Sequence, residues 1–133
     1  MGYQDKKRMV DFYSNVFGWK ATMMGPDMGN YVVMTTTESD EKTGRPKTPG
    51  SINGGFYQKT ENPLSHAPSV VVAVDDIRKA MGDVKASGGK ILGAMTEGGG
   101  HSDEPQDIPG VGLWISAMDT EGNRFSMLQP KGM

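Results

Sequence analysis

The stretch that decides the fold is "GLWISAMDTEGNRFSMLQP", residues 112–130. It begins as an apolar run with β-branched residues, and "DTEGN" at 119–123 has the composition of a tight turn. The run that follows alternates, because one face of a strand would carry Phe125 and Met127 and the other face Arg124, Ser126 and Leu128. The stretch therefore predicts a β-hairpin.

Two helices are predicted upstream of this hairpin from apolar residues that recur at helical spacing. The first covers residues 5–17, with Asp5 as its N-cap and Gly18 as the left-handed residue that ends it. The second covers residues 77–87 and follows the acidic pair at 75–76. Strands are predicted around these helices at 19–24, 30–37, 51–59, 69–74 and 90–95.

The order of these elements repeats within the chain. The second half reads as strand, helix and three strands, and the first half reads the same except that its leading strand is missing. We therefore expect one α+β domain over residues 1–133, built from a module at 1–60 and a module at 68–130. Because the chain opens close to the helix cap, the first strand of module one is expected to be absent.

Composition excludes several classes of protein. The chain has 133 residues, a net charge of -2 and no cysteine, so disulfides and thiolate metal sites are excluded. The sequence has no basic stripe of the kind that indicates nucleic-acid binding, and it has no apolar run long enough to span a membrane. The start, "MGYQDKKRMV", is polar and unlike a signal peptide. We expect a soluble cytoplasmic protein that binds neither nucleic acid nor membrane.

Three stretches resemble the vicinal oxygen chelate superfamily, which includes glyoxalase I, bleomycin-resistance proteins and extradiol dioxygenases. They are "FYSNVFGWK" at 12–20, "VAVDDI" at 72–77 and "DIPGVGLWISAMDTEGNRFSMLQP" at 107–130. The resemblance runs through both modules. It implies two βαβββ modules that form a cupped, eight-stranded mixed sheet around a cavity, often across a dimer.

The resemblance also implies a divalent metal, held by His, Glu or Gln on the first and last strands of each module. Carried over to this chain, the ligand positions of module two fall on Ser69 and Ser126. The fourth-strand position of module one falls within residues 54–57, and the first-strand position is expected to lie before Met1. Serine hydroxyls donate too weakly to replace imidazole and carboxylate. We therefore expect no metal and no other cofactor.

The expected function is binding of a small molecule in the cavity, with no reaction assigned. The predicted cavity residues are Tyr57, Ser69, Trp114, Arg124 and Ser126. Trp114 would stack on a flat ligand and Arg124 would bind a carboxylate. The alternative is a metal-dependent lyase, isomerase or dioxygenase of the same superfamily, whose first-strand ligand was lost upstream of Met1.

Two further expectations concern histidines and assembly. His66 and His101 offer another route to a metal or general base, although His101 follows a run of glycines that would hold a ligand poorly. The strand at 51–59, without a first strand beside it, would expose an unpaired edge. This edge predicts a homodimer, with a chain truncated before Met1 as the other interpretation.

Overall fold

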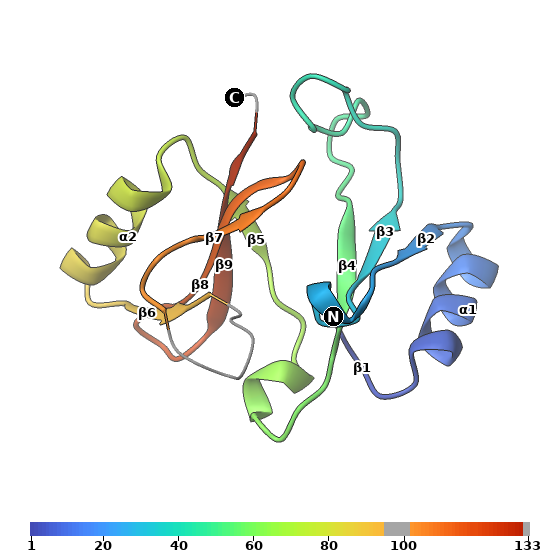
Figure 1. Ribbon diagram of the computed structural model, residues 1–133, viewed down its shortest axis with the longest axis horizontal. Helices are drawn as coiled ribbons and strands as arrows, with labels where there is room; N and C mark the ends of the chain where they lie inside the picture. Colours follow the sequence, from blue (N-terminus) through green and yellow to red (C-terminus); the bar gives the residue numbers. More distant parts are fainter. Residues whose placement is uncertain (95–101, 132–133) are drawn as a thin grey trace. The chain divides into compact units, whose positions relative to one another are not determined.

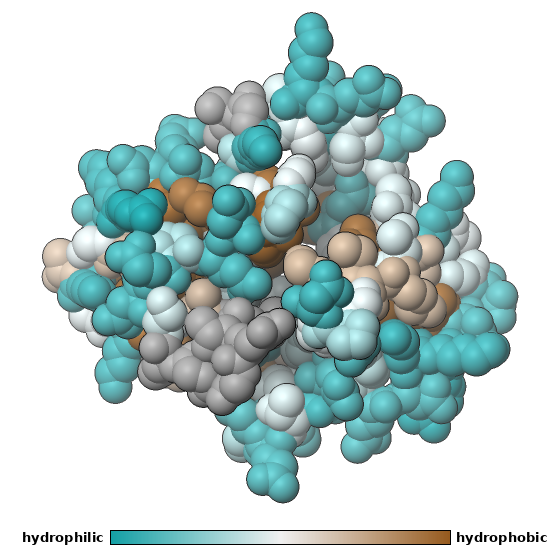
Figure 2. All heavy atoms as spheres, in the orientation of Figure 1, coloured by the Kyte–Doolittle hydropathy of each residue, from teal (hydrophilic) through white to brown (hydrophobic). Residues whose placement is uncertain are grey.

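The computed structural model describes residues 1–94 and 102–131, which form two compact units (Figure 1). Unit 1 comprises Met1–Asp40 and Arg45–Pro68, and unit 2 comprises Glu41–Gly44 and Ser69–Met133. Each unit packs an α-helix on a β-sheet, as expected for an α+β protein with a repeated module. Polar side chains cover most of the face drawn in Figure 2, and hydrophobic residues reach this surface in patches.

Unit 1 contains a four-stranded sheet in the order β1-β4-β3-β2. Only β1 runs parallel to its neighbour, and the other pairs are antiparallel. The short 3₁₀ helices η1 (Pro26–Met28) and η2 (Pro63–His66) lie in the connections. The main elements are β1 (Gly2–Tyr3), α1 (Lys6–Phe17), β2 (Lys20–Met23), β3 (Val32–Thr35) and β4 (Gly54–Gln58).

Helix α1 begins and ends where the sequence predicts. The side chain of Asp5 accepts a hydrogen bond from the Arg8 amide at 3.0 Å, and Gly18 ends the helix with a φ of 73°. Val10 of the helix is buried against the sheet and Met9 and Tyr13 pack beside it, whereas Phe12, Val16 and Phe17 are more than half exposed. The buried core of unit 1 consists of Tyr3, Val10, Val32, Met34 and Phe56.

The expectation that module one lacks its first strand is wrong. Gly2 and Tyr3 form β1, which pairs in parallel with Tyr57 and Gln58 of β4. The N-terminal amine of Met1 also donates to the Gly55 carbonyl at 2.9 Å. Two residues are too few for an alternating pattern, so the strand could not be seen in the sequence. Because β4 now has a neighbour on each side, its predicted unpaired edge does not exist.

Unit 2 contains a five-stranded sheet in the order β5-β9-β8-β6, with β7 also paired to β8. The predicted hairpin is β8 and β9, which pair from Gly112–Pro130 to Met118–Arg124. Its elements are β5 (Val71–Ala73), α2 (Ile77–Ala86), β6 (Lys90–Gly93), β7 (Gln106–Ile108), β8 (Gly112–Met118) and β9 (Arg124–Pro130). Strand β7 was not predicted, because it lies in a loop rich in glycine and acidic residues.

The core of unit 2 lies between α2 and one face of its sheet. Asp76 caps the helix by accepting from the Lys79 amide at 3.0 Å, as expected. The buried residues are Ile77 and Met81 of the helix with Ile115, Ala117 and Met127 of the hairpin. The predicted alternation of the hairpin is thereby confirmed, since the odd-numbered residues of β8 and β9 face the helix. In the part of the chain described here, no helix is long and apolar enough to cross a membrane.

Candidate functional site

The sheet of unit 2 has a second face, turned away from α2, which we call its distal face. Since Ile115, Ala117 and Met127 pack under the helix, the residues between them along each strand point the other way. Trp114 and Ser116 therefore lie on the distal face. Strand β9 adds Arg124, Ser126 and Leu128 to the same face. These include three of the predicted cavity residues.

Cross-strand pairing arranges the distal face of unit 2 in three rows. The basic row contains Lys90, Met118 and Arg124, paired in that order across β6, β8 and β9. The serine row contains Gly93, Ser116, Ser126 and Val71. The aromatic row contains Gln106, Trp114, Leu128 and Ala73.

Three members of the serine row are buried, and the fourth, Val71 on the outer strand β5, is exposed. Ser116 is 8 % exposed and Ser126 is 5 % exposed, and Gly93 beside them is also buried. The amide of Ser126 donates to the Val70 carbonyl at 2.9 Å, so the residues just before β5 already run alongside β9. By this register Ser69 lies beside Arg124 on the distal face. The structure therefore brings together four predicted residues: Ser69, Trp114, Arg124 and Ser126.

Two polar atoms on this face are buried without a partner. The Ser69 hydroxyl and the Gln106 amide oxygen are both inaccessible and form no hydrogen bond with any described residue. Buried polar atoms usually find a partner in the protein, in water or in a ligand. Ser69 lies beside Arg124 of the basic row, and Gln106 lies in the aromatic row directly opposite Trp114.

The corresponding distal face of unit 1 is built differently. Gly55 pairs with Val33 there, and the ring of Tyr31 lies over Gly55 so closely that a side chain at that position would force the ring or the backbone to move. Burial, and to a lesser extent the nearby Tyr57, raise the pKa of Tyr31. Tyr57, the fifth predicted cavity residue, lies on this face of unit 1, and its hydroxyl donates to the Ala67 carbonyl at 2.6 Å. Its role as a cavity wall stays a prediction.

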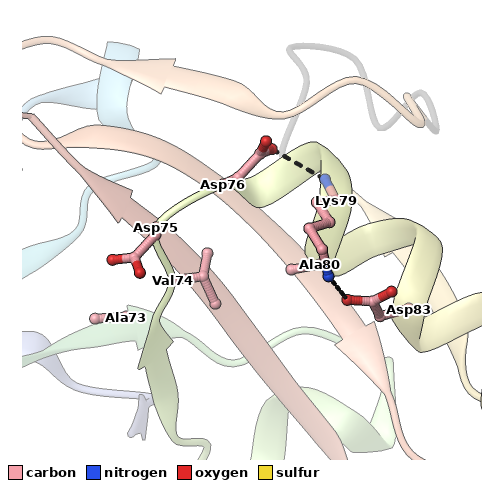
Figure 3. A pocket seen from close by; sticks show the side chains of 7 residues that line it. All are labelled: Ala73, Val74, Asp75, Asp76, Lys79, Ala80 and Asp83. Atoms are coloured by element: carbon pink, nitrogen blue, oxygen red, sulfur yellow. Dashed lines mark hydrogen bonds and ion pairs between the residues drawn. The ribbon is translucent and has the colours of Figure 1, made fainter.

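Two hollows lie at the helix starts rather than on the distal faces. The hollow beside β5 and α2 has a volume of about 410 Å³ and is drawn in Figure 3. Two of its three acids are already engaged, because Asp76 caps the helix and Asp83 forms an ion pair with Lys79 at 2.7 Å, and Asp75 also lines the hollow. A similar hollow of about 360 Å³ lies beside β1 and α1 in unit 1. Both hollows follow from the repeated strand-to-helix connection.

A family model described as the Glyoxalase/Bleomycin resistance protein/Dioxygenase superfamily matches residues 2–127. The chain belongs to this superfamily. The match extends through most of both units. It confirms the family that the three sequence stretches indicated.

Several solved structures share the fold of this chain. A superfamily member from Vibrio splendidus 12B01 is similar with a TM-score of 0.58 and 17% identity, over 97% of this chain and 93% of that one. Methylmalonyl-CoA epimerase from Mycobacterium tuberculosis is similar with a TM-score of 0.61 and 10% identity, over 97% of this chain and 83% of that one. An uncharacterized protein from Methanosarcina mazei gives 0.56 and 12% identity, over 100% and 89%. No curated protein matches the chain.

The residues on the distal faces do not fit the divalent metal that the resemblance to this superfamily implies. On the first strand of module one, Gly2 lies opposite Tyr57 and offers no side chain. In unit 2 the positions are Ser69 and Ser126, with the cationic Arg124 next to them. Across residues 1–94 and 102–131, no group of three or more His, Asp or Glu side chains could hold a metal ion. Imidazole and carboxylate, the donors that such metals need, are missing from these positions.

The two histidines do not alter this result within the described chain. His66 lies in η2, where its Nε2 is 2.8 Å from the Thr60 carbonyl and therefore donates to it. His101 lies outside the described residues. The metal site or general base suggested for the loop around His101 remains a prediction.

Several residues of the distal face were missed by sequence reasoning as members of a site. Ser116 was placed on the correct face, but its pairing with Ser126 depends on the hairpin register. Lys90 joins the basic row only because β6 pairs with β8 across an irregular register between Ile91 and Gly93. Gln106 belongs to β7, which was not predicted at all. Only the hairpin pairing could have been found, by counting outward from the turn at residues 119–123.

Proposed function

We propose that this superfamily member binds a small organic molecule on the distal face of unit 2, without a divalent metal. Ser69, Ser126, Trp114 and Arg124 contact the ligand in this proposal. The observation that carries it is the pair Ser116 and Ser126, whose short polar side chains are buried between the longer side chains of the neighbouring rows. Small-molecule sites combine an apolar lining with a few placed polar groups in this way.

Unpartnered polar atoms support the same proposal. Each buried oxygen that lacks a hydrogen bond costs about 1–3 kcal/mol. A ligand that donates to the Ser69 hydroxyl or to the Gln106 amide oxygen would recover part of that cost. The superfamily name, which includes bleomycin-resistance proteins, is consistent with binding of small molecules.

The absence of a metal in this proposal rests on the donor set. Serine hydroxyls ionise too rarely to bind zinc, nickel or iron strongly, and the charge of Arg124 opposes a cation beside Ser126. Elemental analysis of protein purified without chelators should find these metals well below stoichiometry. Stoichiometric metal that survives dialysis would contradict this part of the proposal and favour a metal-dependent enzyme.

The binding test uses the two tryptophans as internal reporters. A thermal-shift screen of aromatic and amphipathic compounds should yield stabilisers by mass action. Trp19→Phe then leaves Trp114 as the fluorophore, and Trp114→Phe leaves Trp19 in the ring stack of unit 1. Ligands should change the fluorescence of the first variant and leave that of the second unchanged. The reverse result would place the site on another surface.

We also propose that the protein is a cytoplasmic homodimer. Because β4 is paired with β1 and β3, the exposed edge considered in this proposal is β5, the outermost strand of its sheet. Val70, Val71 and Val72 are 66%, 54% and 48% exposed there, and exposed apolar edges favour pairing with another chain. Sedimentation should give a dimer that Val71→Lys converts to monomer. Dimers that persist in this variant would require another interface.

A further inference from the structure

The two hollows at the helix starts have the same origin but opposite charge. Each lies where an outer strand of a sheet leads into a helix, β1 into α1 in unit 1 and β5 into α2 in unit 2. The hollow of unit 2 has an excess of negative charge, because three aspartates and one lysine line it (Figure 3). The hollow of unit 1 has an excess of positive charge, because Arg8 and Lys59 line it with a single carboxylate, that of Asp5.

Both cations of the unit 1 hollow lack a partner within residues 1–94 and 102–131. The guanidinium of Arg8 and the ammonium of Lys59 form neither an ion pair nor a hydrogen bond with this part of the chain. The carboxylate of Asp5 is already engaged, because it caps the helix by accepting from the backbone amide of Arg8. An anion in the hollow would therefore bind the two cations without displacing a contact that the fold uses.

The backbone holds Lys59 beside the start of β1. Its amide donates to the Tyr3 carbonyl at 2.8 Å, and its side chain lies against Gly2, where an added Cβ atom would meet the Lys59 Cγ. Lys59 is half-buried, so packing fixes its apolar stem while the ammonium stays available. Arg8 lines the hollow from the first turn of α1. The two cations thus reach one hollow from separate elements of the fold.

The unit 1 hollow also has an apolar wall that contains an aromatic ring. Met9 and Phe12 of α1 line it, and Phe12 is 56 % exposed, so its ring offers a surface on which a second ring can pack. The volume of about 360 Å³ lies in the range of small-molecule sites, which combine apolar surface with a few placed polar groups. The apolar lining of the unit 2 hollow has no ring and consists of Ala73, Val74 and Ala80.

We propose that the unit 1 hollow binds a small organic acid that carries an aromatic ring. The carboxylate of this ligand lies between Arg8 and Lys59, and its ring packs on Met9 and Phe12. Arginine binds a carboxylate through two parallel hydrogen bonds, and lysine adds a second positive charge. The site belongs to unit 1, so it differs from the site proposed on the distal face of unit 2 and does not depend on it.

The test compares benzoate, phenylacetate and 3-phenylpropionate with their primary amides, and with acetate as an acid that has no ring. Backbone amide chemical shifts, followed during each titration of the full chain, give both the affinity and the location of binding. We expect the best aryl acid to bind about tenfold more tightly than its amide, because each exposed ion pair adds up to about fivefold. Acetate should bind about tenfold more weakly than that acid, since it has no ring to pack on Phe12. The shifts should change at Gly2, Arg8 and Lys59 and stay constant across residues 73–83 of the acidic hollow.

Variants separate the part of the charges from that of the ring. Arg8→Gln combined with Lys59→Gln should bring acid and amide within about twofold of each other while the affinity for the amide stays unchanged. Lys20→Gln removes an equal charge from β2, at the opposite edge of the same sheet, and should change nothing. Phe12→Ala should weaken acid and amide by the same factor, so that their ratio is kept. Phe12→Leu retains apolar bulk at this half-exposed position and replaces the alanine variant if that variant does not fold.

The outcomes separate this inference from the function proposed above. If amides bind in the hollow as tightly as acids, its cations do not select the ligand and the inference is wrong. Acetate binding as tightly as the aryl acids would equally overturn it, because the ring would then have no part. If the acids shift the amides of Trp114 and Ser126 instead of those of Gly2 and Arg8, the inference fails while the distal-face proposal gains support. If no acid changes the amides of the hollow, the inference is overturned whatever the distal face of unit 2 binds.

Discussion

The two units use one scaffold but complete the distal faces of their sheets differently. In unit 1 Val33 pairs with Gly55, and the pair at the same place in unit 2 is Ser116 with Ser126. Lysine opens the strand after the helix in both units, since Lys20 pairs with β3 as Lys90 pairs with β8. The scaffold is therefore repeated, while the centre of the distal face is not.

This difference favours unit 2 as the location of the proposed ligand site. In unit 1 the ring of Tyr31 covers Gly55, so the centre of the face is filled by a side chain of the unit itself. In unit 2 the corresponding positions are buried hydroxyls, and two nearby oxygens have no partner among the described residues. A ligand would add few contacts to a face already covered by the protein's own ring. Buried polar atoms without partners, in contrast, would form hydrogen bonds with a ligand.

The largest effect on stability is expected from giving unit 1 the serine of unit 2. Gly55→Ser places a side chain where the Tyr31 ring lies, so the ring or the backbone must move. We expect a loss of about 2 kcal/mol in the free energy of unfolding, as for other overpacked sites. Chemical denaturation measures this loss. The same substitution in a Tyr31→Ala background should cost much less, because the ring is gone.

The reverse exchange is the matched control. Ser126→Gly should lower the free energy of unfolding by about 1 kcal/mol or less. Glycine loses more backbone conformational entropy on folding than serine, but it displaces no neighbouring side chain. If Gly55→Ser and Ser126→Gly cost the same, the two faces do not differ in packing and the comparison loses its basis.

A smaller difference is expected at the starts of the two helices. Asp5 and Asp76 cap α1 and α2 alike, but α2 has an additional acceptor from β9, since Gln129 Oε1 accepts from the Ile77 amide at 2.9 Å. Gln129→Ala should therefore cost about 1 kcal/mol. The matched residue of unit 1 is Gln58, which is exposed at the same place on β4, and Gln58→Ala should be nearly neutral.

A double-mutant cycle tests whether the two acceptors of α2 act together. Asp76→Ala alone should cost about 1 kcal/mol. Combined with Gln129→Ala it should cost less than the sum, because fraying of the first turn removes both hydrogen bonds at once. Full additivity would show that the two contacts are independent, and an equal loss for Gln58→Ala would remove the contrast between the units.

Local chemistry explains which parts of the fold could be predicted from the sequence. The hairpin, the caps at Asp5 and Asp76, and the stop at Gly18 each depend on residues close together in the chain. Strand β1 could not be found, because its two residues are ordered by β4, which lies far along the chain. Strand β7 was hidden by polar residues whose pairing with β8 becomes visible only in the fold.

The candidate site shows the same limit. Alternation along β8 and β9 placed Trp114, Arg124 and Ser126 on one face correctly, because a strand has a fixed period of two. The partners of these residues depend on register. The basic row forms only because Lys90 pairs with Met118. The distal face of unit 1 is covered only because the Tyr31 ring lies over Gly55. Neither contact leaves a pattern in the sequence.

The smallest predicted effect concerns the link between the last two strands of each unit, and it depends on pH. In unit 1 the neutral Asn53 side chain accepts from the Thr36 amide at 2.8 Å. In unit 2 the carboxylate of Asp119 accepts from the side chain and backbone of Asn123 and from the backbone of Glu121. The hydrogen bonds from Asn123, followed by that from Glu121, hold the pKa of Asp119 below its usual value.

The sign of the effect follows from this lowered pKa. A carboxylate whose pKa is lower in the folded state stabilises the fold above its unfolded pKa, and this stability is lost as the pH falls through the folded pKa. Acid should therefore loosen the β8–β9 turn and leave the Asn53 contacts in unit 1 unchanged. Hydrogen exchange of the Asn123 and Thr36 amides, corrected for intrinsic rates, compares the two links directly. Asp119→Asn should remove the pH dependence at Asn123, and equal loosening at Thr36 would mean that acid acts on the whole fold instead.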